Sequence, residues 1–270
     1  MVTRIAIFAA VLLLLAYGFA QYARRTSMFF PSRDGNWNAA NDGCQDVWFN
    51  ARDGVRLHGW LFRARDPNAP LIVWCHGNAG NIIDRAPMAA ELARRGVFVL
   101  LFDWRGYGKS EGHPDEDALY GDALAAFDFA ARTGRPIIMY GESLGGPYAA
   151  FVAKQRKVHG VIIENSFPSL AALGNAIYHP IPLGWFAPSA MLTTRWLNAA
   201  GVPVLVLHGR RDQVIPFALG QQLFDGLRVP KEMIVSDTAG HCEIPSAEPE
   251  KYYRAVVRFA TRYHVSSRAP

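Results

Sequence analysis

The sequence predicts an α/β protein with a mostly parallel sheet of eight strands and helices on both faces of the sheet. From about residue 45 onward, short runs of β-branched and aromatic residues alternate with longer amphipathic stretches, a pattern typical of repeated βαβ units. Most of the short runs are almost continuously apolar, which indicates strands buried on both faces. The chain has 270 residues, 50% of them hydrophobic, which is enough for one large core.

Eight segments are predicted to form the strands. The first two alternate apolar and polar residues and are separated by Arg52, Asp53 and Gly54, so we expect an antiparallel hairpin at one edge of the sheet. The other six have the apolar character of buried parallel strands. The predicted strands are 45–51, 55–64, 70–77, 97–104, 136–142, 160–165, 203–209 and 231–237.

Helices are predicted in most of the intervals between these strands, where apolar residues recur at helical spacing. One interval, 166–200, is rich in proline and aromatic residues and is too long for a simple crossover loop. It is predicted to be a small cap inserted into a domain that spans residues 45–263. The predicted helices are 82–95, 115–132, 144–156, 216–227 and 247–263.

Residues 1–25 are predicted to form a single membrane-spanning anchor at the N-terminus. Nineteen uncharged residues separate Arg4 from Arg24, and as a helix they would span about 28 Å, close to the thickness of a bilayer core. A cleaved signal peptide is an alternative, because Gly18, Phe19 and Ala20 form a small-x-small site, and a soluble buried helix is another. The flanking charges are too balanced to predict which side of the membrane the domain occupies.

Charge and cysteine content exclude several classes of partner and site. The net charge is +5, but the basic residues are dispersed and form no Lys/Arg-rich block, so no nucleic-acid partner is expected. Cys44, Cys75 and Cys242 are odd in number and show no metal-ligand spacing. We therefore expect no disulfide framework, no metal and no cofactor.

The motif with the clearest chemistry is GESLG at 141–145, which matches the G-x-S-x-G pattern between a predicted strand and a predicted helix. Glycines on both sides allow the sharp turn that would present the hydroxyl of Ser143 at the carboxyl edge of the sheet. Pro147 falls in the first turn of the helix, where a missing N–H costs little. Ser143 is the predicted nucleophile.

A serine nucleophile needs a base, and the base needs a carboxylate that orients it. Asp212 follows the strand predicted at 203–209, and His241 follows the last predicted strand, so both are expected at the same edge of the sheet as Ser143. Asp225 and Asp237 are alternative carboxylates, but the first lies on a predicted helix and the second near the end of a strand.

Two backbone N–H groups are expected to stabilise the negative oxygen of a tetrahedral intermediate. Leu144 supplies one of them because it follows the nucleophile directly. The loop after the strand at 70–77 contains the stretch HGNAGN (76–81), and the main-chain N–H of Asn78 is the second predicted donor. A glycine turn capped by an asparagine would show the same residues.

These motifs resemble an α/β-hydrolase of the serine hydrolase type, and more narrowly the membrane-anchored ABHD13/ABHD17/BEM46-like group, over residues 45–263. The resemblance implies the α/β-hydrolase fold, Ser143 as nucleophile, Asp212 as acid, His241 as base, and Asn78 and Leu144 as oxyanion donors. It departs at Pro147 and Tyr148, where smaller residues are usual. The motifs are HGNAGN (76–81), FDWRGYGKSEG (102–112), GESLGG (141–146), ENSF (164–167), HGRRDQVIP (208–216) and AGH (239–241). Asp103, Arg105, Gly106, Gly108 and Ser110 are implied to shape a loop beside the site without taking part in the chemistry.

The expected function is that of a serine hydrolase that cleaves carboxylic ester or thioester bonds through an acyl-enzyme. Its expected partners are a membrane and a small-molecule or lipid-like acyl substrate. A serine aminopeptidase is less favoured because segment 166–200 lacks an acidic residue to hold a substrate amine. A catalytically silent, membrane-tethered binding domain is a third hypothesis. The apolar side chains of the cap either line an acyl pocket or pack the cap on the sheet; they are Tyr178, Leu183, Trp185, Phe186, Met191 and Trp196.

Overall fold

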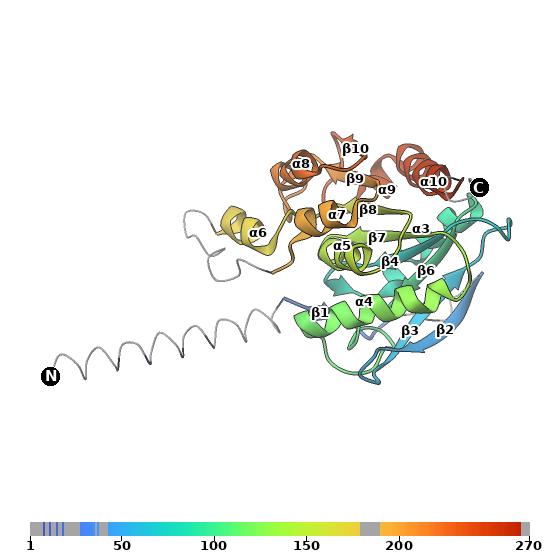
Figure 1. The fold of residues 1–270 in the computed structure, drawn as a ribbon, viewed down its shortest axis with the longest axis horizontal. Coiled ribbons are helices and arrows are strands. Elements are labelled where there is room, and N and C mark those ends of the chain that lie inside the picture. The colour runs from blue at the N-terminus through green and yellow to red at the C-terminus, as the bar shows by residue number, and fades with distance from the viewer. Residues whose placement is uncertain are drawn as a thin grey trace.

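The computed structural model describes residues 8, 11, 15, 18, 28–35, 37, 43–178 and 190–265. In this part of the chain, a central sheet lies between two layers of helices (Figure 1). The sheet has eight strands in the order β10-β9-β8-β7-β4-β6-β3-β2. Strand β3 runs antiparallel to both of its neighbours, and the other pairs are parallel. The predicted α/β class, the mostly parallel sheet and the edge hairpin are confirmed.

Each predicted strand is present with slightly different ends. The strands alternate their side chains between two cores: in β4, Val73 faces one helical layer and Trp74 the other. The strands are β2 (Cys44–Asn50), β3 (Arg56–Phe62), β4 (Leu71–Cys75), β6 (Phe98–Phe102), β7 (Ile137–Glu142), β8 (Gly160–Glu164), β9 (Val204–Gly209) and β10 (Lys231–Ser236).

The helices divide between the two faces of the sheet. One face carries α3 (Ala86–Arg94) and α10 (Pro249–Val265), whose buried residues join the core around Trp74. The other face carries four helices whose buried residues join the core around Val73. These are α4 (Glu116–Ala131), α5 (Gly145–Gln155), α7 (Thr193–Ala200) and α8 (Phe217–Gly226), and the remaining helices are α6 (Leu170–Ile177) and α9 (Ile244–Ala247).

The helix predicted at 82–95 is divided into the 3-10 helix η1 (Ile82–Arg85) and α3. Asn81 caps η1, because its side chain accepts a hydrogen bond from the Ile83 N–H at 2.9 Å. Pro87 lies in the first turn of α3, where the helix needs no backbone N–H, so its missing N–H costs no hydrogen bond. This division places Arg85 at the junction of the two helices.

Two short strands were not predicted. β1 (Phe30–Pro31) and β5 (Ala79–Gly80) form a two-stranded parallel sheet. The Phe30 N–H donates to the Asn78 carbonyl at 2.9 Å, so the chain enters the domain beside the loop that follows β4. The predicted anchor, residues 1–25, lies outside the described residues except at four isolated positions. Within the described ranges, no helix is both long and apolar enough to cross a membrane.

Two helices come from segment 166–200, where the sequence predicts a cap. On α7, Trp196 packs edge-on against Tyr120 of α4 and Phe151 of α5, with ring centroids 5.7 and 5.4 Å apart. For Trp196, this contact favours the packing role over a place in an acyl pocket. Leu183, Trp185 and Phe186 lie outside the described residues.

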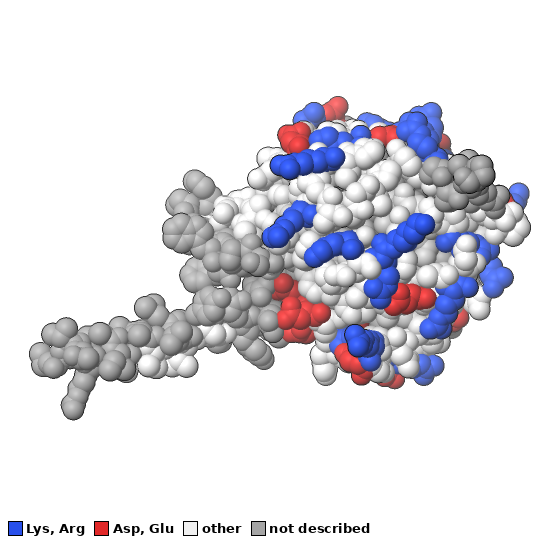
Figure 2. Space-filling model, in the orientation of Figure 1, with Lys and Arg blue, Asp and Glu red and all other residues white. Residues whose placement is uncertain are grey.

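Charged side chains are dispersed on the face shown in Figure 2. Lys and Arg side chains there are separated by neutral surface and interrupted by acidic groups. Arg156 at the end of α5 donates to Asp128 of α4 at 2.8 Å, and both side chains are exposed. An exposed ion pair of this kind contributes about 0–1 kcal/mol.

Candidate active site

Ser143 lies in a sharp turn between β7 and α5, with φ at +53°. A Cβ at Gly141 would come within 2.5 Å of the Gly146 Cα, and a Cβ at Gly145 would come within 1.9 Å of the Cys75 carbonyl oxygen. Only glycine fits at these two positions, so they permit the close turn. The turn holds the serine at the carboxyl edge of the sheet, where the sequence predicted it.

The structure brings Ser143, His241 and Asp212 together from three separate loops. His241 Nε2 lies 3.0 Å from Ser143 Oγ, and His241 Nδ1 lies 2.8 Å from Asp212 Oδ2. Because the ionised carboxylate can only accept, Nδ1 carries the proton, and Nε2 is free to accept from the serine hydroxyl. The three groups therefore form a continuous chain of hydrogen bonds.

The carboxylate of Asp212 is held in place by several further donors. Oδ1 accepts from the backbone N–H groups of Val214 and Ile215 at 2.9 and 2.8 Å. Oδ2 accepts from Asn165 Nδ2 at 2.6 Å, and His208 Nε2 lies 3.4 Å away. Burial alone would raise the pKa of Asp212, but side-chain hydrogen bonds, the first of them from His208, outweigh it and hold the pKa well below its usual range. The acid is therefore ionised at neutral pH.

The competing carboxylates have other partners. Asp225 accepts from Gln221 at 2.9 Å within α8. Asp237 is exposed and pairs with Arg210 at 2.7 Å. Among the described contacts, neither carboxylate reaches His241.

The two predicted oxyanion donors come from different loops. Leu144 is the residue between the nucleophile and α5. The carbonyl of Asn78 accepts from Tyr107 Oη at 2.7 Å and from Phe30 N, which holds this loop against β1. Within the described part of the chain, the N–H groups of Asn78 and Leu144 donate to no protein acceptor. Both are thus available to a ligand.

His76 orients the peptide that carries the Asn78 N–H. Burial lowers the pKa of His76 to about 3, so the ring is neutral, and its Nδ1 donates to the Gly77 carbonyl at 2.7 Å. The C=O and N–H of a trans peptide point in opposite directions. Holding the Gly77 carbonyl toward His76 therefore turns the Asn78 N–H the other way.

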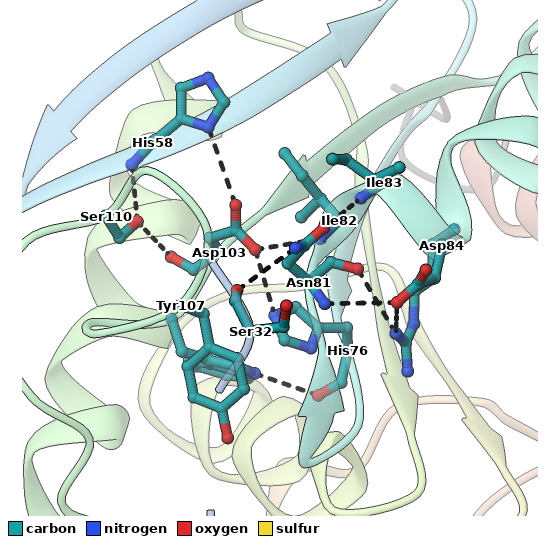
Figure 3. A network of polar contacts seen from close by, with 12 residues as sticks. Ser32, His58, His76, Asn81, Ile82, Ile83, Asp84, Asp103, Tyr107 and Ser110 are labelled. Carbon is teal, nitrogen blue, oxygen red and sulfur yellow. Dashed lines mark hydrogen bonds and ion pairs between the residues drawn. The ribbon is translucent and has the colours of Figure 1, made fainter. Parts of the chain in front are cut away.

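A buried polar network contacts the loop after β4, which carries His76 and Asn81 (Figure 3). Asp103 Oδ1 accepts from the Ile82 N–H at 3.0 Å, and the carboxyl group lies 3.8 Å from ring nitrogens of His58 and His76. Ser110 Oγ donates to the Asp103 carbonyl at 2.7 Å. Burial raises the pKa of Asp103. The network joins β3, β6 and the loop after β4.

The loop after β6, which the family resemblance implied to be shaped by Gly108 and Arg105, is held by close contacts of both residues. A Cβ at Gly108, where φ is +48°, would lie 2.0 Å from Asp103 Oδ2, so a side chain does not fit there. Arg105 pairs with Asp122 and Asp53, each at 2.7 Å, and fastens the loop to α4 and to the β2–β3 hairpin. No described contact of these side chains reaches Ser143.

Several residues of the site were missed by the sequence analysis. Asn165 and His208 were quoted only as parts of family motifs, yet both contact the Asp212 carboxylate. The signal for Asn165 was its place at the end of the strand predicted at 160–165, at the sheet edge where Ser143 and Asp212 were also expected. The buried pair of Arg85 and Glu142 had no sequence signal.

Glu164 is a buried acid at the end of β8, beside the nucleophile turn. Its backbone carbonyl accepts from the Ser143 N–H at 2.8 Å, and its side chain accepts from Tyr140 Oη at 2.5 Å. Burial, together with the charge of nearby Glu142, raises the pKa of Glu164 to about 8. The carboxyl group is therefore largely protonated at neutral pH.

The wild type is expected to lose folding stability as the pH rises toward 9, and Glu164→Gln is expected to remove this loss. The folded protein keeps the proton up to about pH 8, whereas the unfolded chain releases it near the ordinary glutamate pKa, so stability falls as pH rises between the two values. The wild type should lose roughly 2–3 kcal/mol between pH 6 and 9 through this group. Urea unfolding at both pH values measures it, with exposed Glu111→Gln as the control, and equal losses in wild type and Glu164→Gln would contradict the prediction.

The sheet order, the strained serine turn and the site at the carboxyl edge define an α/β-hydrolase, and the chain belongs to this family. Residues 66–196 match the family model described as "Serine aminopeptidase, S33". The uncharacterized protein MT2364 of Mycobacterium tuberculosis is 32% identical over 262 residues, 93% of each chain. The protein bem46 of Schizosaccharomyces pombe is 30% identical over 185 residues, 63% of this chain and 61% of that one. The resemblance to the BEM46-like group is confirmed.

Solved structures share the fold. The Pyrococcus furiosus esterase Pf2001 aligns with a TM-score of 0.70 at 21% identity, over 88% of this chain and 98% of that one. At this identity, the likeness shows the fold alone. The family match and the relatives identify the protein as a hydrolase of the α/β-hydrolase family.

Proposed function

We propose that this protein is a serine hydrolase that cleaves carboxylic ester or thioester bonds of apolar acyl substrates. The observation that carries the proposal is the hydrogen-bonded chain from Ser143 through His241 to Asp212, with distances of 3.0 and 2.8 Å. A serine hydroxyl becomes a nucleophile at neutral pH when a base within hydrogen-bond reach takes its proton. This arrangement supplies such a base and the acid that orients it.

The reaction would proceed in two halves. His241 takes the proton of Ser143 as Oγ attacks the carbonyl carbon, and the N–H groups of Asn78 and Leu144 receive the negative oxygen. The histidine then returns the proton to the leaving alkoxide or thiolate, which leaves an acyl-enzyme. Water then attacks the acyl carbon as His241 takes its proton. The bond between Ser143 Oγ and the acyl group breaks, the histidine returns the proton to Oγ, and the carboxylic acid product leaves. Asp212 remains ionised throughout and stabilises the imidazolium.

Apolar side chains near the site favour an apolar substrate. Phe30, which hydrogen-bonds through its backbone to Asn78, is 62% exposed. Val214, whose backbone N–H donates to Asp212, is 56% exposed. Exposed apolar groups gathered at a site are suited to binding apolar ligands.

A covalent probe and a substrate panel test the proposal together. We expect an alkyl fluorophosphonate to add one adduct to Ser143, detected by peptide mass spectrometry, and p-nitrophenyl esters and acyl thioesters to be hydrolysed. Aminoacyl p-nitroanilides test the aminopeptidase alternative, which the family description raises. If the protein hydrolyses the anilides but not the esters, the proposed ester and thioester substrates are wrong and the aminopeptidase alternative replaces them. If the probe does not label the protein and no substrate is hydrolysed, the protein is a silent binding domain.

We also propose that residues 1–25 anchor the enzyme to a membrane. Removing them should move the protein from the membrane fraction to the soluble fraction with its kcat unchanged within about twofold. The physical reason is that the 19-residue uncharged span lies outside the βαβ pattern, while truncation at residue 25 leaves β1 and its contact with Asn78 in place. Ultracentrifugation after carbonate washing measures the location, with the full chain as the control.

Two outcomes would contradict the anchor. Truncated protein that still sediments with membranes would place the membrane contact elsewhere in the domain. If the full chain is expressed and its mature product begins near Gln21, the segment is a cleaved signal peptide instead.

A further inference from the structure

Arg85, at the junction of η1 and α3, joins two parts of the site that no sequence motif connects. Its side chain is only 13% exposed. The guanidinium lies between the residue that precedes the nucleophile and the loop that carries the Asn78 N–H. Apart from an ion pair of Nη1 with the neighbouring Asp84 at 3.3 Å, its hydrogen bonds fall into two groups.

The first group holds the nucleophile turn. Arg85 Nη2 donates to Glu142 Oε1 at 2.6 Å, and Nε lies 3.2 and 3.3 Å from the two carboxylate oxygens. Trp74 Nε1 donates to the same carboxylate at 3.2 Å. Burial alone would raise the pKa of Glu142, but the adjacent Arg85 charge outweighs it and lowers the pKa. Glu142 is therefore an ionised carboxylate in a buried position. It directly precedes Ser143 in the sequence, so the bonds from Arg85 hold the start of the nucleophile turn.

The second group holds the oxyanion loop. Arg85 Nη1 donates to the carbonyl of Ala79 at 3.1 Å and to that of Asn81 at 3.4 Å. The loop also packs on the ion pair, because a Cβ at Gly77 would lie 3.1 Å from Glu142 Oε1 and 3.6 Å from Arg85 Nη2. Asn78 lies between Gly77 and Ala79, so both flanks of the donor peptide contact this pair.

We propose that Arg85 is a positioning residue that sets the spacing between the two oxyanion donors, the N–H groups of Asn78 and Leu144. One donor belongs to the loop that Arg85 Nη1 holds, and the other follows the turn that Nε and Nη2 hold through Glu142. The donors act on an oxygen that develops only in the transition state, so small errors in their spacing lower the rate with little effect on substrate binding. The inference rests on the proposed serine hydrolase function.

The geometry requires arginine rather than any cation. A guanidinium directs five N–H groups from three nitrogens in one plane, so one edge can bind a carboxylate while another binds carbonyls. A lysine has three donors on a single nitrogen and can pair with Glu142, but it cannot span the carboxylate and the Ala79 carbonyl in the same way. Arg85→Lys therefore preserves the buried charge pair and removes the link to the loop.

The test compares Arg85→Lys with Arg95→Lys in the full chain. Arg95, at the other end of α3, pairs with the surface residue Glu250 and is the matched control. Steady-state kinetics with p-nitrophenyl butyrate should show kcat lowered about 10–100-fold in Arg85→Lys, KM within about threefold, and both values unchanged in Arg95→Lys. Thermal unfolding establishes that each variant is folded.

A second substrate separates oxyanion positioning from general loss of structure. In a thionoester, sulfur replaces the carbonyl oxygen and fits poorly between two N–H donors, so the wild type should strongly prefer the oxygen ester. Arg85→Lys should reduce that preference by about tenfold, because the oxygen ester alone loses well-placed donors. Glu142→Gln, which leaves the Arg85 bonds to the loop intact, should reduce it less and serves if Arg85→Lys does not fold.

The failure of this inference can be distinguished from the failure of the proposed function. A folded Arg85→Lys with wild-type kcat and wild-type preference for the oxygen ester would overturn this inference and leave the proposed function standing. If Arg85→Lys does not fold, Glu142→Gln with wild-type kcat and wild-type preference would overturn it in the same way. A wild-type protein without Ser143-dependent turnover would overturn the proposed function and this inference with it.

Discussion

Ser143→Ala is expected to lower kcat for p-nitrophenyl ester hydrolysis by at least about a thousandfold while the protein stays folded. Without Oγ, no acyl-enzyme can form, and the remaining rate comes from the oxyanion donors and substrate binding alone. The change removes one oxygen atom from a turn at the sheet edge and leaves the glycine packing around it intact, so no core cavity results. Kinetics on purified protein and circular dichroism measure the two effects.

Ser246→Ala is the matched control for Ser143→Ala. Ser246 is an exposed serine whose Oγ donates to the Glu243 carbonyl at 2.9 Å, away from the hydrogen-bonded chain of the site. It should retain wild-type turnover. If Ser143→Ala kept activity within tenfold of the wild type, the nucleophile would have to be another group.

Asp212→Asn is expected to lower kcat by about a thousandfold or more. The carboxylate accepts the Nδ1 proton of His241 and stabilises the imidazolium, whereas a neutral amide supplies no charge and presents an N–H₂ group that favours the wrong tautomer. The lowered pKa of Asp212 means that the enzyme has this charge throughout the neutral range. The backbone N–H groups of Val214 and Ile215 donate to the other oxygen of Asp212, so they should keep the altered side chain near its native place.

The double variant Asp212→Asn/His241→Ala tests whether the groups act as one unit. Its kcat should be little lower than that of His241→Ala alone, because removing the base makes the orienting acid irrelevant. Asp237→Asn, which changes an exposed carboxylate paired with Arg210, is the control. Asp212→Asn with most of its activity, together with an inactive Asp237→Asn, would show that the orienting acid was misassigned.

Local patterns in the sequence were sufficient to predict the strands and the proposed triad residues. Continuous apolar runs marked the buried strands, and glycines marked the turn around Ser143. In a parallel sheet, the loops after the strands meet at one edge, so Asp212 and His241 could be placed beside Ser143 without coordinates. That argument needs only the order of elements along the chain.

The sequence did not predict the two-residue strands or the division of one helix into two. A two-residue strand such as β1 or β5 has no periodicity to detect. The division of the helix at 82–95 depends on the Asn81 cap as well as on Pro87, and the apolar spacing continues across it. His208 lies in the buried strand β9, and its contact with Asp212 depends on how the loop after β9 turns back.

The sequence by itself determined the fold class, the nucleophile turn and the residues proposed for the chemistry, because each of these depends on local propensity or on chain order. Only the tertiary structure decided which side chains support them. Strand β7 lies beside β4 although about 60 residues separate them, and this pairing brings Glu142 to Arg85, the Ser143 turn to the oxyanion loop and, through β8, Asn165 to Asp212. Such contacts depend on the strand order and on which side chains fill the space between neighbouring loops, and neither leaves a periodic pattern along the chain.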